Sequence, residues 1–211
     1  MDLPFIRKKE RVESDSAAVG ALTANNEPTD DELRLKLYKL IIDRYRDMIE
    51  QGETRSVTDL KAMIMPHHEK IVELRESITE NFHPFVYEEH FLSAAKMCFE
   101  HVSSFKTISA PVSFWLEFSE MQSLMAGDEI DKSILLCSLL RSLGSQNAKV
   151  FMTDSRNSYV LFQFGAKSYV ADYSQKDLAE KETGESALES LKGKIIYSFN
   201  DKEYESFQEH E

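Results

Sequence analysis

The sequence is poor in the residues that mark several common functional classes. Of 211 residues only 7 are glycine and 5 proline, with 2 cysteines and 1 tryptophan. So few glycines leave little room for a phosphate-binding loop, and neither a Walker A motif nor a Gly-x-Gly-x-x-Gly fingerprint occurs. No apolar run approaches the roughly 20 residues of a membrane-spanning helix, and the first residues lack the apolar core of a signal peptide. We therefore expect neither a nucleotide-binding loop nor a membrane span.

Positive charge is also scarce. The chain has 25 Lys and Arg against 37 Asp and Glu, a formal net charge of −12. This balance argues against nucleic acid and against an anionic membrane surface, both of which bind concentrated basic residues. Cys98 and Cys137 lie in helix-like runs with apolar neighbours, which favours buried free thiols in a reducing compartment. The alternatives are a disulfide or a relocated nucleophile. We expect a cytoplasmic protein.

The six histidines do not form a recognisable metal motif. His67 and His68 precede Glu69 at a helix start, and Glu80 and His83 are separated from a continuing helix by a proline. None of them has a second matched motif that would complete a four-ligand site. We predict no metal site and no cofactor.

Hydrophobic content of 42% and 13 phenylalanines are ample for one folded domain, with a tail at either end. The composition and the periodicity of apolar residues divide the chain into four parts. These are an arm and linker (1–29), a helical part (30–110), a core (111–200) and an acidic tail (201–211). Helical spacing of apolar residues predicts helices over 30–51, 56–78 (kinked or divided at Pro66), 83–107, 129–143 and 187–191. Period-two alternation predicts strands over 148–152, 159–164, 168–171 and 194–199. Helices followed by antiparallel strands indicate an α+β domain.

Two segments are candidates for contact with another protein. In the arm, Leu3, Phe5 and Ile6 are apolar and precede a basic Arg-Lys-Lys run, so this is either a docking peptide or a disordered terminus. In the first predicted helix, a charged stripe is either a solvated face or a partner-binding face; it consists of Arg34, Lys36, Lys39, Arg44 and Arg46.

Residues 127–144 are the most informative segment. They read Gly-Asp-Glu-Ile-Asp-Lys-Ser-Ile-Leu-Leu-Cys-Ser-Leu-Leu-Arg-Ser-Leu-Gly, a tight turn, an amphipathic helix and a glycine stop. This sequence pattern resembles that of the nucleophile helix in the transglutaminase-like, papain-related cysteine hydrolases. The resemblance extends over about residues 85–175 and includes the approach segment around Phe114 and Trp115. It implies N-terminal helices packed on a transglutaminase-like core, in which a nucleophile-type helix lies beside a small antiparallel sheet.

The same resemblance implies that the catalytic positions are altered. The cysteine position holds Glu129, the histidine position falls on Ser158, or on Asn157 if the register slips by one, and the aspartate position holds Asp172. A carboxylate is a poor nucleophile, and neither serine nor asparagine shuttles a proton near neutral pH as histidine does. Glu129 also suits the first turn of a helix, where a negative charge is favoured by roughly 0.3–1 kcal/mol.

We therefore expect a catalytically inactive transglutaminase-like domain that acts as a protein-binding or scaffold module, with a protein partner. Trp115, Asp128 and Asn157 would line the remaining cleft beside the altered positions. The alternative is a hydrolase with changed chemistry, in which Glu129 and Asp172 act as an acid and base pair.

Overall fold

The computed structural model describes residues 29–51, 57–108 and 116–207. Leu3, Phe5, Ile6 and Trp115 lie outside these ranges. The helices in the described ranges are α1 (Asp30–Gln51), α2 (Val57–Ala62), α3 (Glu69–Thr79), α4 (Tyr87–Ser103), α5 (Phe118–Leu124), α6 (Glu129–Ser142) and α7 (Gly184–Glu189). The strands are β1 (Lys106–Thr107), β2 (Ala126–Gly127), β3 (Lys149–Thr153), β4 (Ser158–Phe164), β5 (Lys167–Asp172), β6 (Asp177–Lys181), β7 (Ile195–Phe199) and β8 (Tyr204–Ser206).

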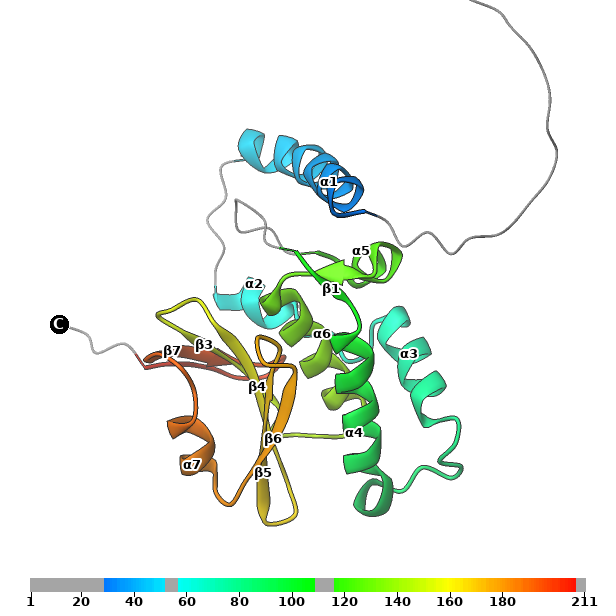
Figure 1. Ribbon diagram of the computed structural model, residues 1–211, viewed down its shortest axis with the longest axis vertical. Helices are drawn as coiled ribbons and strands as arrows, with labels where there is room; N and C mark the ends of the chain where they lie inside the picture. Colours follow the sequence, from blue (N-terminus) through cyan, green and yellow to red (C-terminus); the bar gives the residue numbers. More distant parts are fainter. Residues whose placement is uncertain (1–28, 52–56, 109–115, 208–211) are drawn as a thin grey trace, which may run out of the picture.

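The architecture is α+β, as predicted. Strands β3 to β8 form one antiparallel sheet in the order β6-β5-β4-β3-β7-β8, and β1 pairs with β2 in a short parallel ladder. Figure 1 shows α4 and α6 on one side of the large sheet and α7 on the other. The predicted helix division at Pro66 is confirmed, because α2 ends at Ala62 and α3 begins at Glu69.

The sequence prediction missed two strands of the large sheet, as well as the two-residue strands β1 and β2. We expected a loop before the last short helix, but Asp177–Lys181 forms β6 against β5. We expected an acidic tail from residue 201, but Tyr204–Ser206 forms β8 against β7. Both are edge strands with exposed or half-exposed residues, so their sequences lack the apolar alternation on which the prediction relied. The short helix also begins earlier than predicted, at Gly184.

Helix α6 lies at the centre of the core. Every residue from Asp131 to Arg141 is buried, including the polar Asp131, Lys132, Ser133 and Ser138. The sequence suggested an amphipathic helix, and this is wrong, because α6 is enclosed on all sides. Helices α3 and α4 and strands β3 and β4 pack against it. A helix so enclosed holds the elements at its N-terminus in fixed positions, and Glu129, one of the candidate site residues, lies there.

Helix α1 lies apart from the sheet, above α5 and β1 (Figure 1). Its inner face is anchored by Leu33 and Leu37, which are buried, and by ion pairs from Arg44 to Glu120 and from Lys106 to Asp30. Within the described ranges, none of the helices combines the length and the apolar character needed to cross a membrane.

Candidate functional site

The N-terminus of α6 is held by a reciprocal pair of aspartates. Asp128 is the N-cap, and its Oδ1 accepts a hydrogen bond from the Asp131 amide at 2.8 Å. In return Asp131 Oδ2 accepts from the Asp128 amide at 3.1 Å, which completes a capping box. Asp131 Oδ1 accepts from the Leu116 amide at 3.0 Å, so the same carboxylate also fixes the segment that leads into α5.

Gly127 allows this turn to be tight. A Cβ atom at this position would lie 3.0 Å from Met121 Cε and 3.1 Å from Asp131 Cβ, closer than ordinary van der Waals contact. The glycine therefore permits close approach of α5 and α6. The motif Gly-Asp at 127–128 is explained by the geometry of the turn itself, independently of any catalytic role.

Lys132 ties the other side of the turn to β1. Its Nζ donates to the Phe105 carbonyl at 2.6 Å and to Thr107 Oγ1 at 2.9 Å, and the side chain is buried. Burial, with a smaller contribution from the nearby Lys176, lowers the pKa of Lys132 to about 8. The Nζ also lies 5.9 Å from the centre of the Tyr173 ring. Because its hydrogen bonds all serve the fold, Lys132 acts as a structural anchor.

Glu129, at the first position of α6, is half-buried and lies in a negative environment. Burial raises the pKa of its carboxyl group, and the charges of Asp172 and Asp128 raise it further. Burial likewise raises the pKa of Asp128. Glu129, Asp128 and Asp172 thus interact electrostatically, and we refer to these three residues as the acidic cluster.

The sheet separates the two residues that the resemblance pairs with Glu129. Ser158 faces α6, where its Oγ lies 3.0 Å from Ser133 Oγ in a buried hydrogen bond. Strand β5 pairs with β4 through Val160 and Ala171, and Val170 packs in the small cluster on the α7 side of the sheet. Because side chains alternate, Asp172 lies on the same face as Val170 and on the face opposite Ser158.

Asn157 is better placed to share a face with Asp172. Its side chain forms a hydrogen bond with Tyr159, which belongs to the same small cluster as Val170. The Tyr159 hydroxyl also accepts from the Lys192 amide at 3.3 Å, and the charges of Asp172 and Glu129 raise the pKa of Tyr159 beyond the effect of burial. The face therefore carries Asn157, Tyr159 and Asp172, and Glu129 interacts electrostatically with Tyr159 and Asp172.

Asp172 also stabilises its own turn. Its Oδ1 accepts from the Ser174 amide at 2.8 Å, from Ser174 Oγ at 2.6 Å and from the Gln175 amide at 3.2 Å. These bonds close the connection from β5 to β6. A structural role thus accounts for one oxygen of this carboxylate.

Neither cysteine lies where a nucleophile is needed. Both are free and buried, as the sequence predicted. Burial raises the pKa of Cys98 to about 12, and it raises the pKa of Cys137 as well. A thiol with a raised pKa is protonated at neutral pH and is a weak nucleophile.

Three of the described histidines serve other parts of the fold. The His68 side chain accepts from the Lys70 amide and caps α3, and His90 Nδ1 accepts from the Val86 amide at the start of α4. His101 packs edge-on against Phe105, and burial lowers its pKa. In the part of the chain that the structure describes, no three His, Cys, Asp or Glu side chains are grouped to hold a metal ion.

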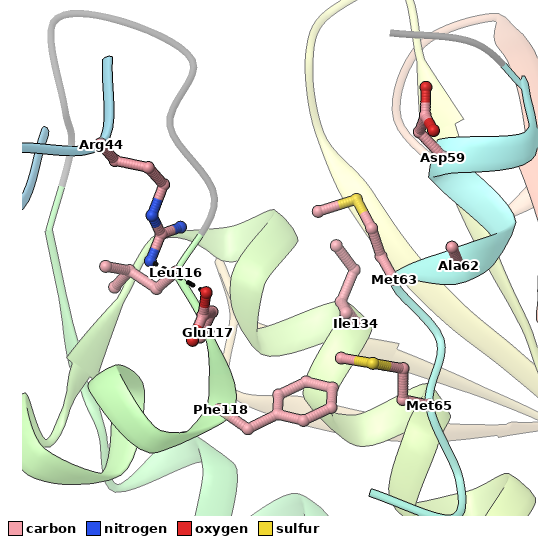
Figure 2. Close-up of a pocket in the computed structure, with 9 residues that line it drawn as sticks. All are labelled: Arg44, Asp59, Ala62, Met63, Met65, Leu116, Glu117, Phe118 and Ile134. Carbon is pink, nitrogen blue, oxygen red and sulfur yellow. Dashed lines mark ion pairs between the residues drawn. The ribbon is translucent and has the colours of Figure 1, made fainter. Parts of the chain in front are cut away.

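An apolar recess lies on another side of α6. Figure 2 shows Met63, Met65, Phe118 and Ile134 converging on it, with Arg44 and Glu117 at its rim joined by a 3.7 Å ion pair. Its volume is about 270 Å³. The recess cannot be predicted from the sequence, because its residues come from four separate segments that only the fold brings together.

Known proteins resemble this chain only distantly. No protein-family model and no curated protein matches the sequence. Among solved structures, calcium-bound LapG from Legionella pneumophila is similar at 19% identity, covering 66% of this chain and 87% of LapG, with a TM-score of 0.42. EGTA-treated LapG is similar at 16% identity, covering 67% of this chain and 86% of LapG, also at 0.42. This distant likeness concerns the fold alone and says nothing about the site or the activity.

Proposed function

We propose that this chain is a catalytically inactive, protein-binding domain. The observation that carries the proposal is the composition of the site at the N-terminus of α6. It holds carboxylates, an asparagine and a tyrosine, whereas acyl transfer needs a nucleophile beside a proton-accepting base. The residues that match the altered catalytic positions also have structural roles, since Ser158 bonds to Ser133 and Asp172 closes a turn.

Exposed apolar side chains support the binding role. Leu35, Tyr38 and Ile42 are exposed on α1, and Met65 is exposed at the rim of the apolar recess. Single exposed apolar residues are ordinary on protein surfaces, but grouped ones mark contact surfaces. Three of these four share one helix face, which favours a site of protein contact.

A hydrolase with altered chemistry is the second candidate. It is favoured by one observation, the different environments of two neighbouring carboxyl groups. The pKa of Glu129 is raised, whereas Asp172 accepts three hydrogen bonds, and such a difference suits a general acid and a general base. Under this alternative, Glu129→Gln and Asp172→Asn would each abolish turnover of the substrate.

Capture from native lysate tests the binding role. The full chain should retain a protein partner at constant stoichiometry, and Glu129→Gln should retain it equally well because the acidic cluster takes no part in binding. Recovery of no reproducible partner, or loss of the partner in Glu129→Gln with an unchanged melting temperature, would contradict the proposal.

Residues 1–28 offer a separate test of how the partner is bound. If Leu3, Phe5 and Ile6 form a docking peptide, deletion of residues 1–28 should weaken capture and leave the melting temperature nearly unchanged, because the arm would add little to the core. A fall of several degrees in the melting temperature, or capture unaffected by the deletion, would remove the arm from the binding site.

A further inference from the structure

Helix α1 has a second apolar face that points away from the core. Leu33 and Leu37 bury the inner face, at 2% and 4% exposed. Leu35, Tyr38 and Ile42 lie on the opposite side, at 71%, 43% and 62% exposed. Their spacing of three and four residues is that of the a and d positions in a coiled coil. We call these three residues the outer seam.

Two of the residues beside the outer seam are positive. With Leu35 and Ile42 at a and Tyr38 at d, Arg34 occupies the g position and Lys39 the e position. Arg34 has only a long 3.9 Å contact with Asp31, and both side chains are largely exposed. Lys39 is exposed and belongs to none of the ion pairs found among the described residues. The outer seam of this strongly acidic chain is therefore flanked by Lys39, which has no ion pair among the described residues, and by Arg34, whose one ion pair is long and exposed.

This charge pattern disfavours a second copy of the chain as the occupant. The e and g residues of one helix meet those of its partner and decide which helices pair. In a parallel pair Arg34 would face Lys39 of the second copy, and in an antiparallel pair Lys39 would face its own equivalent. Both arrangements bring like charges together, which costs binding energy.

We infer that the outer seam binds an amphipathic helix of a partner protein whose flanking residues are acidic. Such a helix would cover Leu35, Tyr38 and Ile42 with its own apolar residues and place carboxylates against Arg34 and Lys39. This inference rests on the proposed function, because it names the partner class for a protein-binding domain. The N-terminal arm fits less well as an occupant, because its apolar residues precede Arg7, Lys8 and Lys9. These residues carry the same positive charge as the residues that flank the outer seam.

Two synthetic helical peptides distinguish the chemistry of the occupant. Both carry the same Leu and Ile residues at a and d, and they differ only in having Glu or Lys at e and g. The full chain should bind the Glu peptide at least about tenfold more tightly than the Lys peptide, measured by fluorescence anisotropy. Binding of the Glu peptide should weaken as salt rises, because the flanking charges are exposed. Equal binding of both peptides, or binding of neither, would overturn the inference.

Substitutions locate the binding and supply the controls. Leu35→Glu should weaken the Glu peptide by about tenfold or more, because it removes a central apolar anchor. Lys39→Glu should weaken the Glu peptide and strengthen the Lys peptide. Lys96→Glu, a matched charge reversal at an exposed position on α4, should change neither. If Lys39→Glu leaves both affinities unchanged, the seam is not the binding face and the inference fails.

Three other occupants appear as distinct outcomes. Dimers in sedimentation that Leu35→Glu dissociates would identify a second copy. Binding of the Glu peptide only after deletion of residues 1–28 would identify the arm. Co-sedimentation with phosphatidylserine-containing vesicles that Leu35→Glu abolishes would identify a membrane surface. Each of these results would overturn the inference, whereas capture of a partner through another surface would leave the proposed function intact and remove only the inference.

Discussion

At the scale of single residues, the side chains of the candidate site suit the fold. Glu129 begins a helix, where a carboxylate is favoured by the helix dipole, yet burial and two neighbouring carboxylates oppose its ionisation. Asn157 and Tyr159 share a face with Asp172, whereas Ser158 points into the core. The residue nearest in role to a base is therefore an amide, which does not accept a proton near neutral pH.

Glu129→Gln should raise the free energy of unfolding slightly at pH 7, by about 0.5 kcal/mol or less. A carboxyl whose folded pKa is raised costs stability where it is ionised, and that cost disappears below its unfolded pKa, when both states hold the proton. The gain should therefore shrink as the pH falls from 7 to about 4, as measured by urea denaturation.

The matched control is Glu69→Gln, since Glu69 is exposed in the first turn of α3. It should lose about 0.3–1 kcal/mol at pH 7 through the helix dipole alone. If Glu129→Gln is destabilising by the same amount, the repulsion within the acidic cluster is too weak to matter.

At the scale of elements, α6 and its capping box position the site. Asp131 satisfies the amide of Asp128 and the buried amide of Leu116 with one carboxylate, and Lys132 holds β1 beside the same turn. The shape of the turn therefore depends on these hydrogen bonds rather than on the side chain of Glu129. Removal of one of these bonds should affect folding before it affects any chemistry.

Asp131→Ala should lower the free energy of unfolding by about 2–4 kcal/mol, because it removes the N3 side chain of the capping box and leaves a buried amide unpaired. Ser186→Ala removes the equivalent N3 side chain from the exposed capping box of α7 and should cost only about 1 kcal/mol. Chemical denaturation of both variants checks the comparison, and equal losses would show that the Leu116 bond contributes nothing.

At the scale of the whole molecule, one buried arginine connects the central helix to the far edge of the sheet. Arg141 Nε donates to Asp201 at 2.6 Å, and its Nη1 donates to the carbonyls of Ser145 and Gln146. The side chain is 3% exposed. These hydrogen bonds explain the arginine of the Leu-Leu-Arg sequence at the end of α6, because they hold the loop before β8.

Arg141→Leu should cost about 3–5 kcal/mol, because it leaves Asp201 and two carbonyls without their donor. It should also increase hydrogen exchange in β8. Lys149→Met is the matched control, because Lys149 pairs with the exposed Glu203 at 2.7 Å and should cost at most about 1 kcal/mol. Unchanged hydrogen exchange in β8 of Arg141→Leu would show that the hydrogen bonds of Arg141 do not hold this edge of the sheet.

The sequence predicted the central helices and strands because their apolar periods are strong. The strands predicted over 159–164 and 168–171 lie within β4 and β5, and the helix predicted from residue 129 begins at Glu129. The prediction failed where the burial of residues does not follow an apolar periodicity in the sequence. This is the case at the polar edge strands β6 and β8 and at α6, which the fold encloses completely. The outer seam was missed because the helical spacing of the inner apolar residues already predicted α1, and only burial separates Leu35 from Leu33.

Turnover by the purified full chain tests the central claim most directly. Peptide amides, esters and amine acceptors should be incubated with the chain across about pH 5–9, which spans the range where carboxyl, imidazole and thiol groups act in catalysis. We predict no hydrolysis or transamidation above that seen with Glu129→Gln or with buffer. Turnover that scales with protein concentration and is lost in Glu129→Gln, with its melting temperature unchanged, would contradict the account.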